Sequence, residues 1–303
     1  MRNKHPYFSI ITPSFNQGQF IQRTIDSVLS QRFPGLEYLV IDGGSTDNTV
    51  QILESFGDVI GWVSERDRGQ AHAVNKGLVA ARGDVIGWLN SDDVYYPGSL
   101  QAVHDFLEAN PDVNILYGMA DHIDEHDNII ESYYNEEWDY ERLKNVCYIC
   151  QPAVFFRRSI VDTFGLLDEG LRYCMDYEYW LRIGKENPMH YLKRKLAGSR
   201  LHESTKTLGS AVGVHEEILR MFKAKLRVVP NAWLFAHAHV VARAEGLSES
   251  AADLRFLRRI IAVSAADALR LLGYIPFSMI RTYVDWIVSG LKTRYREKMG
   301  ERL

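Results

Sequence analysis

The sequence has few of the residues that stabilise small secreted domains and structural metal sites. Only 3 of its 303 residues are cysteine. Cys147 and Cys150 have the C-x-x-C spacing of half a zinc site, but no second pair follows, and Cys174 stands alone. We therefore expect reduced, buried thiols rather than a disulfide framework, a zinc site or a redox centre.

Long apolar runs are also lacking. The first run, Tyr7 to Ile11, is too short for the core of a signal peptide and is closed by Thr12-Pro13, so we expect a cytoplasmic protein. The apolar segment from Leu271 to Val288 is interrupted by Arg281 and Asp285, which argues against a membrane-spanning helix.

Positive charge is not in excess. The formal net charge is -4, so we expect no nucleic-acid partner. The C-terminus is a local exception: apolar residues that share a helical face are followed by basic residues, namely Ile280, Tyr283, Val284 and Ile287, then Lys292, Arg294, Arg296 and Lys298. This pattern is typical of a helix that lies on an anionic membrane, and a docked helix with a solvated basic tail is the alternative.

The residues that are present predict an α/β fold. Strand and helix patterns alternate through the first third of the chain, with strands at 8–11, 38–41, 60–63 and 85–89 and helices at 21–29, 50–56 and 70–81. This order predicts a mainly parallel sheet with helices on both faces. The middle is less regular, with a helix at 99–108, strands at 113–117 and 154–156, and a hairpin or loop at the acidic run 121–127. Only helices follow from about residue 207, so we expect a domain over 1–205 and a helical region over 206–303.

Two adjacent carboxylates follow the strand at 85–89, in the segment Asn90-Ser91-Asp92-Asp93. In open α/β sheets, ligands bind in the crevice beyond the carboxyl ends of the strands. Two carboxylates at this edge suit a hard divalent cation that leaves positions for phosphate oxygens. Taken alone, these residues also fit turn and helix-cap chemistry.

Four polar segments follow successive strands: Thr12-Pro13-Ser14-Phe15-Asn16, Asp42-Gly43-Gly44-Ser45-Thr46-Asp47, Ser64-Glu65-Arg66-Asp67-Arg68-Gly69 and Asn90-Ser91-Asp92-Asp93. In this order and spacing, the chain resembles the family 2 glycosyltransferases over roughly residues 7 to 205. These are inverting enzymes of the GT-A (Rossmann-like) fold that use nucleotide sugars. The resemblance implies transfer from a nucleotide diphosphate sugar, with a UDP-sugar favoured, to a hydroxyl of a saccharide or lipid-linked acceptor in polysaccharide or glycolipid synthesis.

The resemblance also implies a nucleotide site. It assigns this site to Thr12, Ser14, Asp42, Asp67, Arg68 and Asp92. Asp42 is expected to accept a hydrogen bond from the base, with capping of the Gly43-Gly44 turn as the alternative. Asp67 and Arg68 are expected near base and phosphate, with a surface ion pair as the alternative. Lys76 can reach a phosphate or end a helix.

A divalent cation, Mg2+ or Mn2+, is expected at the diphosphate. The resemblance makes Asp93 the first choice of ligand, with His202 completing the metal shell and Asp92 contacting the ribose or the donor sugar. Because the family's DxD-type motif here reads Asn90-Ser91-Asp92-Asp93, the sequence leaves open which carboxylate touches the metal.

Inversion requires one general base that takes the proton of the acceptor hydroxyl. The resemblance places this base at Asp176, where capping of a helix is the alternative role and Glu178 is the reserve. Gln151 and Pro152 begin a strand that lies beside the acceptor site in relatives.

Other functions fit less well. A sugar-phosphate nucleotidylyltransferase needs a Gly-rich basic loop after the first strand, and a dinucleotide-binding oxidoreductase needs G-x-G-x-x-G there; Thr12 to Asn16 has neither. A catalytically silent nucleotide-sugar or glycan-binding module is disfavoured by the acids at Asp92, Asp93 and Asp176.

Overall fold

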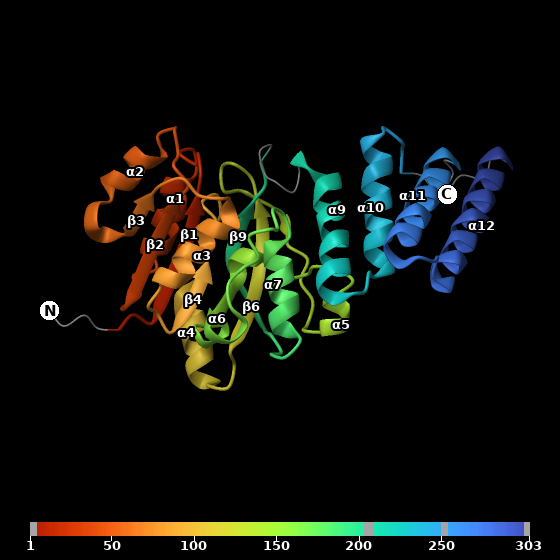
Figure 1. Cartoon of the computed structure of the whole chain (residues 1–303). Coiled ribbons are helices and arrows are strands. Elements are labelled where there is room, and N and C mark those ends of the chain that lie inside the picture. The colour runs from red at the N-terminus through yellow and green to blue at the C-terminus, as the bar shows by residue number, and fades with distance from the viewer. Residues whose placement is uncertain (1–4, 203–208, 250–253, 300–303) are drawn as a thin grey trace. The chain divides into compact units, whose positions relative to one another are not determined.

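The computed structural model describes residues 5–202, 209–249 and 254–299 (Figure 1). The chain divides into two compact units. Unit 1 consists of Met1–Leu143 and Cys147–Leu208, and unit 2 consists of Lys144–Val146 and Gly209–Leu303. The domain boundary predicted between 205 and 206 lies outside the described residues and stays a prediction.

A single mixed sheet forms the centre of unit 1. Within the described residues it has nine strands, in the order β3-β2-β1-β4-β8-β6-β9-β5, with β7 paired to β6. The strands are β1 (Phe8–Ser14), β2 (Leu36–Asp42), β3 (Gly61–Ser64), β4 (Val85–Trp88), β5 (Val94–Tyr95), β6 (Ile115–Ile123), β7 (Ile129–Ser132), β8 (Val154–Arg157) and β9 (His190–Arg200). The predicted α/β class is confirmed.

The parallel part of the sheet is its N-terminal half. β1 pairs in parallel with β2 and β4, and β2 pairs in parallel with β3. Beyond β4 the sheet is mixed, because β8 runs antiparallel to both β4 and β6, while β9 is parallel to β6. The acidic run at 121–127 closes the β6–β7 hairpin, as one of the two predicted alternatives.

Helices connect the strands of unit 1. They are α1 (Ile21–Leu29), α2 (Thr49–Ser55), α3 (Gln70–Ala80), α4 (Ser99–Ala109), α5 (Tyr140–Leu143), α6 (Ser159–Phe164) and α7 (Met175–Gly184). The four predicted helices of this unit correspond to α1–α4, and none differs by more than one residue at either end. Apolar periodicity is strong there because one face of each helix is buried.

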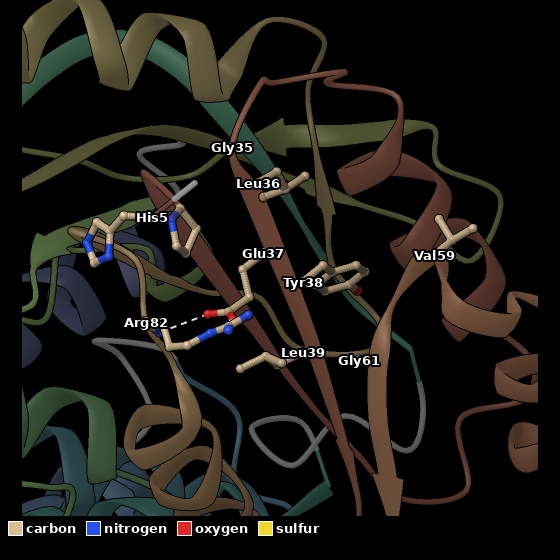
Figure 2. Close-up of a pocket in the computed structure, with 10 residues that line it drawn as sticks. His5, Gly35, Leu36, Glu37, Tyr38, Leu39, Val59, Gly61 and Arg82 are labelled. Atoms are coloured by element: carbon tan, nitrogen blue, oxygen red, sulfur yellow. Dashed lines mark hydrogen bonds and ion pairs between the residues drawn. The ribbon is translucent and has the colours of Figure 1, made fainter. Parts of the chain in front are cut away.

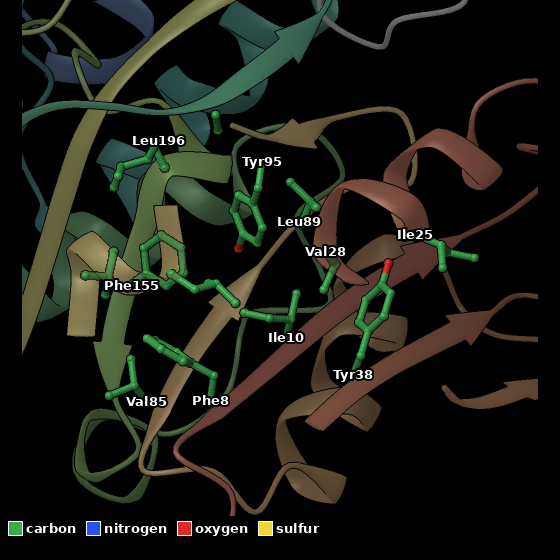
Figure 3. Packing of buried hydrophobic residues seen from close by; sticks show 14 of the residues in the cluster. Phe8, Ile10, Ile25, Val28, Tyr38, Val85, Leu89, Tyr95, Phe155 and Leu196 are labelled. Carbon is green, nitrogen blue, oxygen red and sulfur yellow. The ribbon is translucent and has the colours of Figure 1, made fainter. Parts of the chain in front are cut away.

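Buried apolar side chains from strands and helices pack together in the core of unit 1 (Figure 3). All seven residues of β1 are buried, because β1 has a paired strand on each side. Phe155 of β8 stacks on Tyr95 and meets the ring of Phe8 edge-on, with centroid distances of 5.4 and 6.1 Å. Gly87 is needed at this crossing, since a Cβ atom there would lie 2.9 Å from Cε1 of Phe155.

The described part of unit 2 is helical. It contains α9 (Ala211–Met221), a short π-helix (Phe222–Leu226), α10 (Asn231–Ala244), α11 (Leu254–Leu272) and α12 (Phe277–Met299). Its small apolar core joins α10 and α11 through Ala238, Ala242, Phe256, Leu257 and Ile260. Among the described helices, none has the length and apolar character needed to cross a bilayer.

Candidate active site

A cleft of about 1070 Å³ opens at the carboxyl ends of the parallel strands of unit 1. Each of the four polar segments contributes residues to it: Ser14 after β1, Gly43 after β2, Asp67 after β3 and Asp92 after β4. Segments that are separated by tens of residues meet here because parallel strands end at one edge of the sheet.

Asn90 is the centre of a hydrogen-bond network that includes Asp93. Its Oδ1 accepts from Gln70 Nε2 at 2.7 Å and from Trp88 Nε1 at 2.9 Å. Its Nδ2 donates to Asp93 Oδ2 at 3.1 Å and to Gln151 Oε1 at 3.0 Å. Every hydrogen-bonding position of the amide is therefore used, so Asn90, which itself lines the cleft, holds its neighbours in place.

Asp93 is buried, and both of its carboxylate oxygens accept hydrogen bonds. Oδ1 accepts from the backbone N–H of Arg200 at 2.8 Å, and Oδ2 accepts from Asn90. Burial first, and then the charge of Asp92, raise the pKa of Asp93 well above its usual range, against the lowering effect of these two donors. Asp93 thus ties the end of β9 to the loop after β4.

Both acids line the cleft, and Asp92 differs from Asp93 in being the more exposed of the two. Its side chain is 21% exposed, and its Oδ2 lies 3.0 Å from His202 Nε2. His202 follows β9, and its ring packs against Phe20, with 4.7 Å between the ring centroids. A carboxylate oxygen and an imidazole nitrogen from distant parts of the sequence therefore lie side by side on the cleft wall.

Arg200 holds this wall together, although it is not among the residues predicted from the sequence. The side chain is buried, and its Nε donates to the backbone oxygen of Asp92 at 2.7 Å. Its guanidinium also donates to the backbone oxygen of Asp124, pairs with Asp127 and lies 5.0 Å from the ring centroid of Phe20. The available signal was a basic residue two positions before His202.

The pair of Asp92 and His202 fits a cation that the substrate helps to bind. The described residues contain no group of three or more His, Cys, Asp and Glu side chains that could hold a metal ion unaided. Mg2+ instead binds through one or two carboxylates, and phosphate oxygens and water complete its shell. Because both oxygens of Asp93 are engaged, the geometry favours Asp92 over Asp93 as the ligand. The ligand assignment itself stays a prediction.

Thr12 and Ser14 have different surroundings at the end of β1. Ser14 lines the cleft, and its buried Oγ has no hydrogen-bond partner among the described residues. Thr12 is fully buried, and its Oγ1 lies 3.0 Å from Tyr38 Oη, inside the protein. Ser14 is therefore available to a ligand, whereas Thr12 supports the strand.

Asp42 is fully buried beneath the turn that follows β2. Its carboxylate accepts from the backbone N–H groups of Gly44 and Ser45, at 3.1 and 2.8 Å. It also accepts from the hydroxyls of Ser45 and Ser64, at 2.5 and 2.6 Å. Asp42 does not line the cleft, but Gly43 and Gly44 do. The geometry matches the turn-capping alternative, and a contact between Asp42 and a nucleotide base stays a prediction.

Asp67 and Arg68 both line the cleft. Asp67 Oδ1 accepts from the N–H of Gly69 at 2.8 Å. Arg68 donates through Nε and Nη2 to one carboxylate oxygen of Glu169, at 3.0 and 2.6 Å. An exposed ion pair of this kind contributes little free energy, so the guanidinium can exchange Glu169 for a phosphate at small cost.

Asp176 lies in the first turn of α7 and lines the cleft. Cys174 occupies the N-cap position, and Asp176 Oδ1 accepts from the N–H of the adjacent Tyr177 at 2.7 Å.

The thiol of Cys147 also lines the cleft. Burial first, and then the charge of Asp176, raise the pKa of Cys147. None of the three cysteines forms a disulfide within the described residues; Cys150 and Cys174 are buried, as predicted, and Cys147 is half-buried.

Two charged residues named from the sequence are engaged elsewhere. Lys76 lies inside α3 rather than at its end, and its Nζ is 2.5 Å from a carboxylate oxygen of Glu65. Glu178 is buried and binds Arg182 with both oxygens, at 3.0 and 2.9 Å. Neither side chain lines the cleft, so the geometry does not support Glu178 as the reserve base.

A second cavity, of about 430 Å³, lies at the amino ends of the strands (Figure 2). Glu37 and Arg82 form an ion pair within it, at 2.6 Å. The same Glu37 accepts from Ser9 Oγ at 2.5 Å. The charge of Glu37 is thus neutralised within the protein, and we assign no ligand to this cavity.

A comparison with protein families matches residues 9–165, more than half of the chain, to glycosyl transferase family 2. The chain belongs to this family. Among its relatives is an uncharacterized glycosyltransferase of Rickettsia prowazekii (strain Madrid E), 29% identical over 237 residues and covering 73% of each chain. Chondroitin synthase of Escherichia coli is 27% identical over 202 residues, which are 65% of this chain and 29% of the relative. The resemblance to the family 2 glycosyltransferases, carried by the four segments, is confirmed.

Solved structures show the same fold. TarS 1-349 of S. aureus in complex with UDP-GlcNAc has a TM-score of 0.60 and 16% identity, and the match covers 97% of this chain and 92% of the other. The mannosyltransferase PcManGT from Pyrobaculum calidifontis, in complex with GDP-Man and Mn2+, has a TM-score of 0.58 and 17% identity, covering 97% and 88%. The glycosyltransferase therefore has the predicted GT-A fold.

The network around Asn90 leads to a stability prediction. We expect Asn90→Asp to lower the free energy of unfolding by about 2 kcal/mol or more. A carboxylate at this position cannot donate a hydrogen bond to Asp93 or Gln151, and its charge repels the carboxylate of Asp93. Urea unfolding measures this loss. Asn16→Asp is the matched control, since Asn16 uses only its Oδ1, as acceptor from Thr46. Equal stability of the two variants would mean that the Asn90 network is dispensable.

Proposed function

We propose that this enzyme transfers a sugar, with inversion, from a nucleotide diphosphate sugar to a hydroxyl of a saccharide or lipid-linked acceptor. A UDP-sugar is the favoured donor, and polysaccharide or glycolipid synthesis is the favoured setting. The observation that carries the proposal is that Asp92, His202 and Asp176 line one cleft. The nucleotide sugars in the complexes of TarS and PcManGT, and the name of the chondroitin synthase relative, support it.

The donor side of the proposed site lies at the ends of β1, β2 and β3. Ser14 offers a buried hydroxyl that has no protein partner within the described residues, and Gly43 and Gly44 let a ligand approach the backbone closely. Arg68 can turn from Glu169 to a phosphate. Asp42 and Thr12 act on the donor indirectly, by fixing the turn and the strand beneath it.

Asp92 and His202 would hold the divalent cation, Mg2+ or Mn2+. When bound, the cation neutralises charge on the diphosphate and so favours its departure. Asp93 keeps Asp92 and His202 in register, because it binds both the loop after β4 and the end of β9.

Asp176 is the proposed general base. Its carboxylate takes the proton of the acceptor hydroxyl while that oxygen bonds to the anomeric carbon. The bond from this carbon to the diphosphate oxygen breaks on the opposite face, and the electron pair leaves with the nucleoside diphosphate. A single displacement of this kind inverts the anomeric configuration.

Two measurements test this function. In a thermal-shift panel of UDP-, GDP- and dTDP-sugars, we expect one donor to raise the melting temperature by several degrees in a Mn2+-dependent way, because a ligand at 100 times its Kd stabilises by about 2.7 kcal/mol. The product formed with that donor should show the inverted anomeric configuration by NMR. Retention of configuration contradicts the mechanism, and binding with neither transfer nor donor hydrolysis supports a silent binding module instead.

The proposed place of action is the cytoplasm, at the inner face of the membrane, where a lipid-linked acceptor would be available. The C-terminal helix is the part of the chain that would make the membrane contact.

A further inference from the structure

The C-terminal helix α12 is docked within unit 2 by one of its faces. Met279 and Tyr283 are buried, and Tyr283 Oη lies 2.9 Å from Ser264 Oγ of α11. Trp286 packs against the core cluster formed by α10 and α11. Tyr283 thus packs against α11, whereas Ile280, Val284 and Ile287, which the sequence groups with it on one helical face, are exposed.

Beside this docked face, α12 carries a second apolar surface, which we name the outer stripe. Its six members are between 42% and 82% exposed: Phe277, Ile280, Val284, Ile287, Val288 and Leu291. Steps of three and four residues place them along one side of the helix, away from Met279 and Tyr283. Single exposed apolar side chains are common, but a continuous exposed stripe marks an interaction surface.

The charges near the outer stripe indicate its partner. Arg281 and Lys292, both exposed, flank the stripe, and Asp285 is the acidic residue of the same segment. Residues 277–303 contain six Lys and Arg against three Asp and Glu, in a chain of net charge -4. By sequence, an excess of positive charge therefore belongs to the same C-terminal segment as the outer stripe. A second copy of the chain would present the same charge, whereas an anionic bilayer presents the opposite one.

We propose that the outer stripe docks the protein on an anionic bilayer surface, with α12 lying along the interface and Arg281 and Lys292 facing the lipid headgroups. Phe277, the most exposed member of the stripe, comes three residues after the exposed Tyr274, which lies in the turn before α12, and aromatic rings of this kind favour the membrane interface. This inference rests on the proposed function only where it places the acceptor at the membrane. Docking of α12 on the bilayer does not require the nucleotide-sugar donor.

Vesicle sedimentation with the full chain tests the docking. We expect the protein to pellet with vesicles of phosphatidylcholine and phosphatidylglycerol at low salt, to release as salt increases, and to stay in the supernatant with pure phosphatidylcholine. The variant Ile280→Ser/Val284→Ser/Leu291→Ser should bind at least about tenfold more weakly, since it removes apolar area that inserts into the interface.

A matched control is Val59→Ser/Val79→Ser, which removes two exposed valines of unit 1 and should bind as the unchanged chain does. Both variants should keep their melting temperature, because every altered side chain is exposed. A full-length protein that stays in the supernatant with anionic vesicles at low salt overturns the proposal, as does a stripe variant that still pellets. A dimer that the stripe variant abolishes, without vesicle binding, makes a second copy the partner instead. Donor binding, measured separately by thermal shift, keeps this outcome distinct from failure of the proposed function.

Discussion

Asp176→Asn should lower the turnover rate by on the order of a hundredfold or more, while donor affinity stays near that of the unchanged enzyme. Asparagine has nearly the size of aspartate and can still accept the hydrogen bond from the N–H of Tyr177. It cannot accept the proton of the acceptor hydroxyl. Steady-state kinetics with saturating donor, together with calorimetry of donor binding, measure the two quantities.

Glu178→Gln is the control for this prediction. Glu178 lies on the same helix two residues later, but it is buried against Arg182 and does not line the cleft. We expect this variant to lose stability and to retain most of its turnover at a temperature where it is folded. If Asp176→Asn turns over at a near-normal rate and Glu178→Gln does not, the base is Glu178.

Asp92→Asn should remove the Mn2+-dependent part of nucleotide binding and lower transfer by on the order of a hundredfold. The reason is that Asp92 presents the partly exposed carboxylate beside His202 Nε2. An amide oxygen carries no charge and binds a divalent cation more weakly than a carboxylate does. Calorimetry with UDP, with and without Mn2+, gives the metal-dependent difference directly, and His202→Ala should act in the same direction but more weakly.

Asp93→Asn is the matched variant, one position along the chain. Because Asp93 binds Arg200 and Asn90 inside the protein, its substitution should lower the free energy of unfolding and leave most of the metal-dependent affinity in the folded fraction. The reverse result, with metal dependence lost in Asp93→Asn and kept in Asp92→Asn, would restore Asp93 as the ligand.

Sequence patterns predicted the helices and strands whose apolar residues recur at a regular spacing or form an unbroken run. The helix expected at 21–29 is α1 with the same bounds, because its apolar residues recur on one buried face. β9 was not predicted, since its first half is largely exposed and carries Lys193, Arg194 and Lys195 in place of an apolar run. The two residues of β5 are too few for any periodicity. A strand of this kind forms because it hydrogen-bonds to a neighbouring strand, and one neighbour of β9 is β6, more than 70 residues earlier in the chain.

The sequence alone determined the class of this protein. Alternating strands and helices specify an α/β sheet, parallel strands end at one edge, and the polar segments after those strands carry the family signature with Asp92 and Asp93 in it. Asp176 follows later in the chain, at the start of a predicted helix. Each of these features occupies a short stretch of the chain, so it can be recognised from the sequence without knowledge of tertiary contacts.

Only the tertiary structure decided how each acid is used. Asp92 and Asp93 are neighbours in sequence, yet one faces the cleft beside His202 and the other is buried against the N–H of Arg200. Asp42 and Thr12 resemble ligand residues, but their hydrogen bonds go to Ser45, Ser64 and Tyr38. The exposed stripe of α12 is likewise separate from its docked face only in three dimensions. In each case the deciding partner is distant in sequence or lies on another face, and burial and hydrogen bonding with that partner, rather than residue type, set the role.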